Sequence, residues 1–529
     1  MSALKAISRF TGKELPELME VKPVVVADVI NFEMKKALFL FFSLFVVFEY
    51  TAAQDIDSVK VYKKRVLEST EVDLLMSLYN QDGSHSPVNG GIGTEKLVNG
   101  TPTIVLSIPL NANSVLTVDA GISAYTSASS SNINPFHLVP STYKSAGLTG
   151  VTAASRGGGT PTYTPVTSTP VTYKTIGTPW LESTGASHSD VLKAVHADFS
   201  HSSDSRNFLW GSNLSLSKEY DYKSYGFGGN VTGLFNEKNT EIGLKGSVFL
   251  DQWKPIYPTE LREYADYGLN FQSNGYFKGI KVYDHIGVVT TAYLPSGFKE
   301  WDQKGRNSYT LSIFASQILS QKLQLAFFFD LVKQEGMLST PYQRVYFADK
   351  PNYYIGTVSD ISIYTTTSNH GVYQLADNIE KMPNSRFKLP LGARFSYYIN
   401  EWLVLKSYYR FYLDDWGLKA HTINFDLPVR TSQSFSITPS FRYYVQNQSD
   451  YFAPFETHLS TEKYYTSDYD LSKFHSEQYS LAFNYTDIFT RHSILSMKFK
   501  NANVKFSYYT RSDGLTANIV SFGVKFVAK

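Results

Sequence analysis

Residues 433–446 read QSFSITPSFRYYVQ, and this stretch decides the fold. From Phe435 onward every second residue is Phe, Ile, Pro, Phe, Tyr or Val, whereas the residues between them are Ser, Thr, Arg, Tyr and Gln. Successive side chains of a β-strand point to opposite faces, so the alternation predicts a strand with one apolar and one polar face. Pro439 weakens the pattern locally, because it removes one backbone donor from the ladder.

The same alternation recurs along the rest of the chain after residue 69. With the stretch just quoted it gives about sixteen strands. These are predicted at residues 70–80, 102–110, 115–125, 190–202, 206–219, 223–235, 239–252, 307–319, 322–334, 386–399, 402–413, 417–429, 433–446, 474–485, 502–511 and 515–527.

The connections between these strands alternate in length. Joins after even-numbered strands are mostly short, as at 203–205, whereas joins after odd-numbered strands include the long segments. Exceptions are short joins at 220–222, 414–416 and 512–514 and a longer one at 486–501. Short periplasmic turns and long extracellular loops are typical of a transmembrane barrel. We therefore predict an all-β fold, a transmembrane antiparallel up-and-down β-barrel over residues 70–529. The long segments lie at 81–101, 126–189, 253–306, 335–385 and 447–473.

Composition agrees with strands that face lipid on one side and water on the other. Aromatic residues make up 15% of the 529 residues and charged residues only 18%, where soluble domains have roughly 25% charged residues. The mean hydropathy of −0.21 argues against a helical membrane protein. The net charge of +2 is too small to indicate nucleic acid as a partner. Because the chain has no cysteine, disulfides and thiolate chemistry are excluded.

The N-terminal region carries an export signal. Residues 34–53 contain Lys35 and Lys36, an apolar run of about twelve residues and then Thr51-Ala52-Ala53, the layout of a secretory signal peptide. The apolar run is too short for a membrane-spanning helix. We therefore expect residues 1–33 to be an upstream extension outside the mature protein and residues 54–69 to be a short periplasmic segment. The predicted location is the outer membrane of a Gram-negative bacterium.

The polar faces of the strands separate the charges. If those faces line the lumen, the first nine strands point acids inward, with Lys245 the sole base, and the remaining strands point bases inward, with Asp426 the sole acid. This separation would produce a transverse field across an open lumen. Alternatively, these charges pair with one another or with an inward loop and fill a closed interior. The acidic wall is Glu71, Asp73, Asp119, Asp198, Glu241, Asp251 and Asp330. The basic wall is Lys388, Arg394, Lys406, Arg410, Arg442, Lys505, Arg511 and Lys525.

A second group of polar residues falls at the outer ends of the strands. Its carboxylates could bind a hard divalent cation or bridge cations to lipopolysaccharide phosphates. They could equally be ordinary turn residues, since Gln-Asp-Gly and Ser-Asp-Gly are turn signals, and we predict no defined metal site. This outer rim is Asp82, His85, Glu95, Asp414, Asp415, Asp450 and Asp513.

Signals for catalysis are weak. The sequence contains no G-x-S-x-G elbow, no H-E-x-x-H motif and no phosphate-binding loop. His196 and Asp198 share a strand face and could form an acid–base pair, but no serine nucleophile is evident from the spacing. We predict no enzyme, no catalytic residues and no cofactor.

Several segments resemble an uncharacterised family of bacterial exported β-barrel proteins, a domain of unknown function. They occur in the expected order and span nearly the whole mature chain. The resemblance implies the fold and the location but no activity. Members often lie near genes for flavin-attachment or thioredoxin-like proteins, which implies at most a link to envelope redox chemistry. The segments include YNQDGSHSPVNGGIGTEKL at 79–97, YTSASSSNINP at 125–135, LSTPYQRVYF at 338–347, YLDDWGLKAHT at 412–422 and FRYYVQNQSDYF at 441–452.

Three functions remain open at this point. The first is a channel or transporter for small hydrophilic solutes, since sixteen strands can enclose a water-filled lumen. The second is a non-conducting scaffold or binding barrel that uses its extracellular loops. The third is an accessory to envelope redox chemistry. Expected partners are outer-membrane lipid, lipopolysaccharide and, during biogenesis, the barrel assembly machinery. The sequence leaves open the oligomeric state and whether the 126–189 loop plugs the lumen.

Overall fold

The computed structural model describes residues 65–125, 137–140, 173–176, 190–302, 304–363, 372–490, 492–494 and 497–528. The chain divides into two units, Met1–Gln54 and Asp55–Lys529, and all described residues belong to the second. The predicted upstream extension at 1–33 and signal peptide at 34–53 lie outside the described residues. So do most of the 54–69 segment and most of the 126–189 loop.

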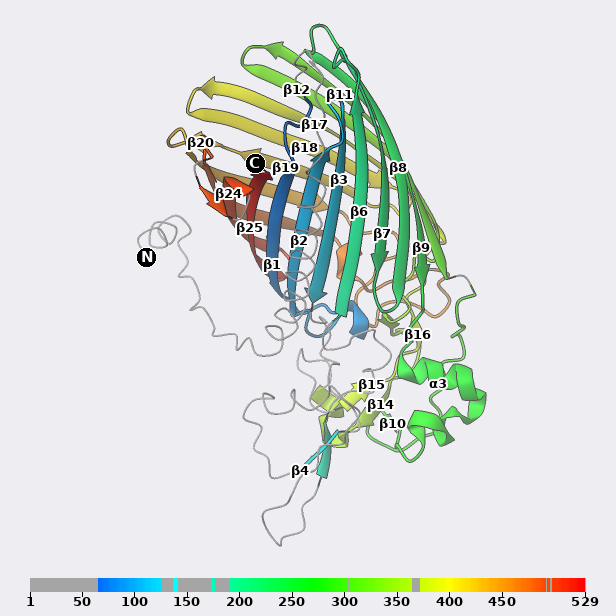
Figure 1. The fold of residues 1–529 in the computed structure, drawn as a ribbon. Helices are drawn as coiled ribbons and strands as arrows, with labels where there is room; N and C mark the ends of the chain where they lie inside the picture. The colour runs from blue at the N-terminus through cyan, green and yellow to red at the C-terminus, as the bar shows by residue number, and fades with distance from the viewer. Residues whose placement is uncertain are drawn as a thin grey trace. The chain divides into compact units, whose positions relative to one another are not determined.

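Within the described residues, sixteen long antiparallel strands form one closed sheet (Figure 1). Each strand pairs with its neighbour along the chain, and β1 also pairs with β25, so the sheet has no free edge. The strands are β1 (Glu71–Asp82), β2 (Leu97–Pro109), β3 (Ser114–Tyr125), β6 (Asp190–Ser202), β7 (Phe208–Lys218), β8 (Tyr222–Phe235), β9 (Thr240–Trp253), β11 (Gly305–Ser320), β12 (Leu323–Gly336), β17 (Ser385–Asn400), β18 (Leu403–Asp414), β19 (Lys419–Asp426), β21 (Phe435–Gln446), β22 (Phe474–Thr486), β24 (Met497–Arg511) and β25 (Thr516–Ala528).

The predicted barrel and its strand number are confirmed. Closure explains why the fold suits a membrane, since every backbone donor and acceptor in hydrocarbon needs a partner. The seam shows this directly: Leu75 of β1 lies opposite Thr103 of β2 on one side and Gly523 of β25 on the other.

Three strands differ from the prediction by more than two residues at one end. β2 begins at Leu97 rather than at 102, and β24 begins at Met497 rather than at 502. The start of β2, Leu97-Val98-Asn99-Gly100, does not alternate in polarity, and in β24 a register shift between Phe499 and Asn501 interrupts the alternation. Backbone pairing does not depend on side-chain polarity, so both strands extend further. The predicted strand at 417–429 is interrupted after Asp426, where Pro428 cannot donate to the ladder, and resumes as the two-residue β20 (Val429–Arg430). A short β23 (Ser493–Ile494) pairs with the start of β24.

The outward face of the barrel is apolar and accessible. Leu214 and Leu216 of β7 are 57% and 56% exposed, and Phe327 of β12 and Phe506 of β24 are similarly accessible. A contiguous exposed apolar surface of this kind fits contact with lipid rather than with water. No helix among the described residues is long and apolar enough to cross a membrane.

Four of the long loops pack together at one end of the strands and form what we call the loop cap (Figure 1). The cap comprises residues 83–96, 254–304, 337–384 and 447–473, so far as they are described. Its main core joins Tyr257 and Leu261 of the second loop to Tyr346 and Ile379 of the third, with Phe455 of the fourth packed against them.

The secondary structure of the loops is short. Their elements are η1 (Pro87–Asn89), β4 (His137–Pro140), β5 (Tyr173–Ile176), α3 (Thr259–Tyr267), η3 (Gly268–Ser273), η4 (Gly275–Phe277), β10 (Tyr283–Asp284), β13 (Arg344–Val345), β14 (Tyr353–Gly356), η5 (Val358–Ile363), β15 (Val372–Gln374), β16 (Asn378–Ile379) and η6 (Tyr469–Leu471). α3 buries Leu261 in the cap core and ends at Gly268, whose positive φ of 56° suits a residue without a side chain.

Candidate functional site

The strand register determines which side chains share a face. Residues directly opposite each other on paired strands point to the same side. Followed around the barrel, the register places both predicted charged walls on one face, opposite the face that carries Leu214, Phe227 and Phe506. Because the latter face is apolar and accessible, the charged face is the lumen face.

The ends of β1, β24 and β25 away from the loop cap carry a cluster of ion pairs. Lys525 Nζ lies 2.9 Å from Glu71 Oε2 and 3.2 Å from Asp73 Oδ2. Lys500 Nζ bonds the other oxygen of Glu71. Two acids of the predicted acidic wall are therefore neutralised by bases at the seam where the first and last strands meet.

A third acid of that wall has a histidine partner. His196 Nδ1 lies 3.0 Å from Asp119 Oδ2 on the neighbouring strand. The acid–base pair considered from sequence, His196 with Asp198, is not the pair that forms here. The His196 and Asp119 side chains are 36% and 35% exposed, so the structure leaves them open to solvent in the lumen.

Asp251, near the cap end of β9, is paired with a base that the sequence analysis missed. Arg306 Nη2 lies 3.0 Å from Asp251 Oδ2, and the guanidinium carbon lies 5.4 Å from the centre of the Trp253 ring. Arg306 was missed because the strand was predicted to begin at 307. β11 begins at Gly305, and Arg306 lies directly opposite Asp251.

Most of the basic wall has no acidic partner. Among the described residues, Lys525 and Arg511 form ion pairs, with Glu71 and Asp73 and with Asp470 and Asp513 respectively. The other members of the wall form none with any described residue. They are Lys388, Arg394, Lys406, Arg410, Arg442 and Lys505.

Aromatic rings hold part of this wall in place. The Arg394 guanidinium carbon lies 5.8 Å from the centre of Phe328 and 5.7 Å from that of Tyr408, and these two rings stack at 5.5 Å. Arg410 lies 5.9 Å from the ring centre of Tyr412. Cation–π contacts orient a guanidinium without neutralising it.

The acidic wall is more fully compensated. Glu71, Asp73 and Asp251 have lysine or arginine partners, and Asp119 has His196, which carries a charge only when protonated. Among the described residues, Asp198, Glu241 and Asp330 form no ion pair, so the unpaired charges of the two walls are six basic against three acidic when His196 is charged and four when it is neutral. The unpaired bases lie on strands between β17 and β24, so this side of the lumen is the positive one.

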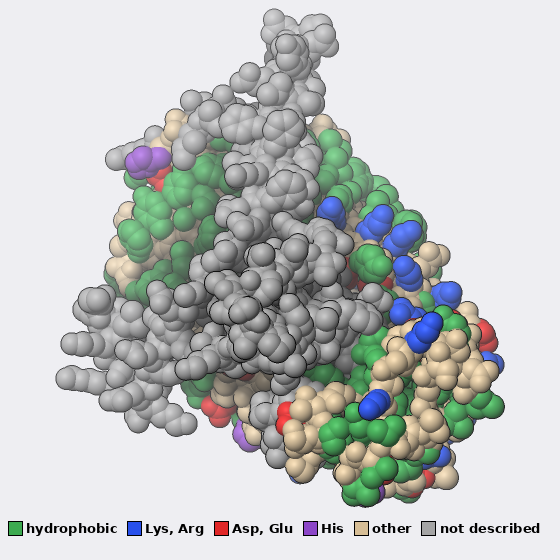
Figure 2. All heavy atoms as spheres, turned by 90° about the horizontal axis from the view of Figure 1, so that it is seen from below, with side chains coloured by type: hydrophobic (Ala, Val, Ile, Leu, Met, Phe, Trp, Pro, Cys, Tyr) green, Lys and Arg blue, Asp and Glu red, His purple; other side chains and the backbone are tan. Residues whose placement is uncertain are grey.

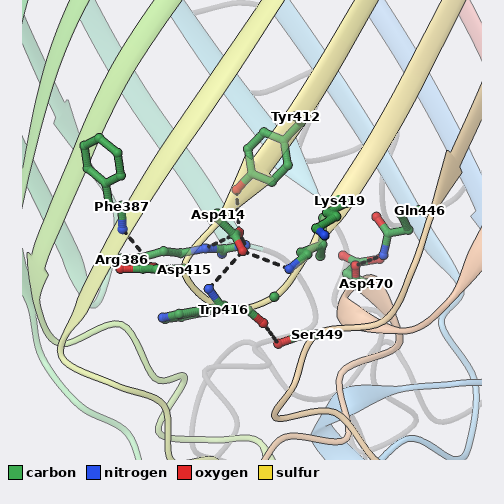
Figure 3. Close-up of polar contacts among 12 residues, drawn as sticks. Arg386, Phe387, Tyr412, Asp414, Asp415, Trp416, Lys419, Gln446, Ser449 and Asp470 are labelled. Atoms are coloured by element: carbon green, nitrogen blue, oxygen red, sulfur yellow. Dashed lines mark hydrogen bonds and ion pairs between the residues drawn. The ribbon is translucent and has the colours of Figure 1, made fainter.

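Asp414 organises the outer mouth on the basic side (Figure 3). Its Oδ2 accepts hydrogen bonds from Arg386 Nε at 2.9 Å and Tyr412 Oη at 2.7 Å. Its Oδ1 accepts from the backbone amides of Trp416 and Leu418, both at 3.0 Å. This predicted outer-rim residue is thus fully buried and closes the β18–β19 turn. Arg386 was not among the predicted site residues, although it has the same strand parity as Lys388.

The other outer-rim residues also have local partners. Asp82 lies 3.6 Å from Lys96, and Asp415 accepts from the Phe387 amide at 2.9 Å. The His85 ring stacks on Tyr469 at 3.8 Å.

Further along the rim, Glu95 accepts from the His85 amide at 3.1 Å, and burial raises the pKa of the Glu95 carboxyl. The backbone amide of Asp450 donates to Trp416 O, and Asp513 pairs with Arg511. The structure distributes these residues around the rim, and within the described residues no group of three His, Asp or Glu side chains could hold a metal ion.

The loop cap is anchored on the lumen side of the strand ends. Gln446 Nε2, at the end of β21, donates to the carbonyl oxygens of Asp470 at 2.9 Å and Ser472 at 2.6 Å (Figure 3). Arg511, at the end of β24, donates to the carbonyl of Tyr469 at 2.9 Å. The fourth cap loop therefore lies against the inner edge of the mouth.

Solved structures with a barrel fold align over most of the chain at low identity. A bacterial polysaccharide outer membrane secretin aligns with 88% of this chain and 100% of its own, at 10% identity and a TM-score of 0.36. A BenF-like porin from Pseudomonas fluorescens Pf-5 aligns with 87% of this chain and 98% of its own, at 7% identity and 0.35. A Pseudomonas aeruginosa FadL homologue aligns with 87% and 90%, at 8% identity and 0.33. The fold assignment rests on the strand pairing described above.

No curated protein matches the chain in sequence. The resemblance to an uncharacterised family is confirmed: residues 43–522 match the family described as a protein of unknown function (DUF3570), and the chain belongs to that family.

Proposed function

We propose that the protein is an outer-membrane channel that passes small hydrophilic solutes and favours anions. The charge of the lumen face carries this proposal. Among the described residues, six bases of the basic wall have no acidic partner, whereas three acids of the acidic wall have no lysine, arginine or histidine partner. Unpaired charges on a water-filled wall attract mobile ions of opposite sign, whereas paired charges largely cancel.

The accessibility of the lumen face supports a conducting interior. Leu75, which shares the face of Asp73, is 40% exposed although it lies inside the closed sheet. Apolar side chains of a packed interior are instead covered by neighbours. Barrels of sixteen to eighteen strands are wide enough to leave an aqueous passage.

The hydrogen bonds that anchor the loop cap support a restricted entrance at the cap end of the barrel. The contacts of Gln446 and Arg511 draw residues 469–472 against the lumen side of the mouth. A solute that enters from outside therefore passes the cap before it reaches Arg410 and Arg442, which lie midway along β18 and β21. The cap is a size filter, and the basic wall below it is a charge filter.

Single-channel current in planar bilayers tests this proposal. Steady conductance steps are expected with potassium chloride, and the reversal potential in a salt gradient is expected to show preference for chloride. The double variant Arg410→Glu, Arg442→Glu should shift the reversal potential toward potassium. The matched control reverses Lys322, in a short turn, and Lys419, whose side chain lies on the lipid side, and should leave the reversal potential unchanged. A correctly folded but silent barrel would overturn the channel function.

The second candidate is a non-conducting barrel that uses its loops to bind a partner. The compact cores of the loop cap favour this alternative, because loops that only connect strands do not need to bury Phe271, Phe277 and Tyr293 together. A silent barrel with an intact cap would direct the search for function to that surface.

A further inference from the structure

Three lysines lie side by side on the outward face of the barrel, at the cap ends of adjacent strands. The register places Lys193 of β6 opposite Lys218 of β7, and Lys218 opposite Lys223 of β8. All three side chains are exposed, and none forms an ion pair with a described residue. Like charges directly opposite each other on paired strands are destabilising, so this row favours an external anion.

Among the described residues, Glu219 of the adjoining turn forms no ion pair with the lysine row. Glu219 and Asp221 lie between β7 and β8. Burial raises the pKa of the Tyr342 hydroxyl in the loop cap, and the nearby carboxylates of Asp221 and Glu219 raise it further. Glu219 follows Lys218 directly and therefore has the opposite strand parity. By contrast, Lys96 elsewhere on the rim has Asp82 at 3.6 Å.

Further lysines continue the positive surface toward the cap. Lys254, Lys304 and Arg262 line a cavity of about 380 Å³ together with Glu300, Tyr220, Tyr257 and Trp301. The amide of Lys254 donates to Asp221 O at 2.7 Å, which ties this cavity to the turn between β7 and β8. Seen from the loop end, basic side chains gather along one edge beside hydrophobic ones (Figure 2).

The surface next to the lysine row, away from the cap, is apolar. The adjacent outward row across the same strands is Val195, Leu216, Tyr225 and Leu250, all of them exposed. Two residues further along β8 and β9 begins a groove of about 580 Å³ in the outer wall, which extends across β11, β12 and β17. It is lined by Phe227, Val248, Tyr309, Leu311, Leu331 and Phe387.

Gly246 forms the floor of this groove. A Cβ atom added at Gly246 would meet nothing within 4 Å. Lys333 lies at the groove edge, where its Nζ donates to Ser385 Oγ at 2.6 Å. Phe227 lies four residues from Lys223 along β8, about 13 Å at the rise of a strand.

We propose that this face of the barrel binds a phosphorylated, acylated glycolipid of the outer leaflet. Its phosphates lie on Lys193, Lys218 and Lys223, and one acyl chain occupies the groove over Gly246. This inference rests on the proposed function, in which the barrel lies in the outer membrane and the loop cap lies on the outer side of that membrane. A charged row above an apolar groove complements an amphiphile with its anionic headgroup at the surface and its chains below.

Native mass spectrometry of the full chain in detergent tests the proposal with three probes: bisphosphorylated lipid A, lipid A stripped of phosphate, and inorganic phosphate. The variant Lys193→Gln, Lys218→Gln, Lys223→Gln removes the headgroup site. The matched control Lys238→Gln, Lys322→Gln, Lys498→Gln removes three exposed lysines at the opposite strand ends. The variant Gly246→Leu fills the groove and leaves the lysines in place.

Each lysine near an anionic surface contributes about a fivefold change in affinity, so the triple variant should weaken binding of phosphorylated lipid A on the order of a hundredfold. The control should bind like the wild type, and Gly246→Leu should weaken both lipids but not inorganic phosphate. Equal affinity for the two lipids, or equal loss in the control, would overturn the proposal. The proposal would also be overturned if the triple variant and Gly246→Leu both bound phosphorylated lipid A as tightly as the wild type.

Conductance recorded on the same preparations separates this inference from the proposed function. A silent barrel that still retains lipid A overturns the channel and supports the lipid site. Suppose instead that the barrel conducts, binds lipid A with and without phosphate equally well, and binds it equally well in the triple lysine variant. This result overturns the lipid site and leaves the channel function standing.

Discussion

Arg344 Nε lies 2.9 Å from Glu260 Oε1, and neither side chain has any exposure to solvent. The pair joins the third cap loop to α3 of the second. Arg344 Nη1 also donates to Val88 O of the first loop at 3.1 Å, and Glu260 Oε1 accepts from the Ala376 amide at 3.2 Å. This ion pair therefore ties three segments of the loop cap together.

Removal of one partner should open the cap. Arg344→Met leaves the Glu260 carboxylate buried without a counter-charge, which typically costs about 3–5 kcal/mol. We expect hydrogen exchange in the cap loops to rise sharply while the barrel strands stay protected. The double variant Arg344→Met, Glu260→Leu removes both charges and should recover most of the protection. Equal exchange in Arg344→Met and the wild type would contradict this account.

Acidic pH should stabilise the loop cap. Burial raises the pKa of Glu380 from 4.5 to about 7 and that of Asp377 from 3.8 to about 7. A raised carboxyl pKa means that the folded cap binds protons that the open cap releases. The resulting stability is fully present below about pH 4, is lost as the pH rises through 7, and stays constant above that.

Hydrogen exchange of the cap, corrected for its intrinsic pH dependence, should therefore be slower at pH 5 than at pH 8. Glu380→Gln keeps the side chain neutral and should flatten this dependence. Asp349 is the matched control, because hydrogen bonds from Ser460 lower the pKa of its exposed carboxyl and move its titration below this window. If Asp349→Asn flattened the profile as much as Glu380→Gln, the assignment would be wrong.

The first cap loop depends on a glycine at its closest approach to the core. Gly90 has a φ of 75°, and a Cβ atom there would lie 2.6 Å from the buried ring of Tyr346. Gly90→Ala should cost about 1–3 kcal/mol from backbone strain alone, with the clash in addition. Gly514→Ala isolates the strain, since Gly514 has a φ of 98° and a Cβ would meet nothing within 4 Å. We expect Gly90→Ala to raise amide hydrogen exchange in residues 83–96. This rise should exceed the one that Gly514→Ala causes in the turn between β24 and β25.

Local alternation was enough to predict the barrel. Polarity in stretches such as Phe435 to Gln446 reports directly which face meets lipid, and the lengths of the joins then order the strands. Alternation failed where it was weak, as at Asn99 and Gly100 of β2, because backbone pairing with β1 extends the strand regardless of side-chain polarity.

The loop cap could not be predicted, because its contacts join residues far apart in sequence. Arg344 meets Glu260 and Val88 across 84 and 256 positions respectively, and no local pattern indicates either contact. The face of each wall residue follows from strand parity, but its partner depends on register. Parity gives Asp251 its side of the sheet, whereas only the pairing of β9 with β11 brings Arg306 to it.

The barrel seam provides the last prediction. Glu71 joins β1 to β24 and β25 through Lys500 and Lys525, so Glu71→Gln should weaken closure between the first and last strands. The lysines are partly exposed and Asp73 remains beside Lys525, so the loss should be modest, about 1 kcal/mol. Urea unfolding, followed by the mobility of the folded band on unheated gels, measures it. Glu241→Gln is the control, because Glu241 lies on the same lumen face and forms no ion pair with a described residue. An equal shift in the two variants would mean that lost charge in the lumen, rather than the seam contact, sets barrel stability.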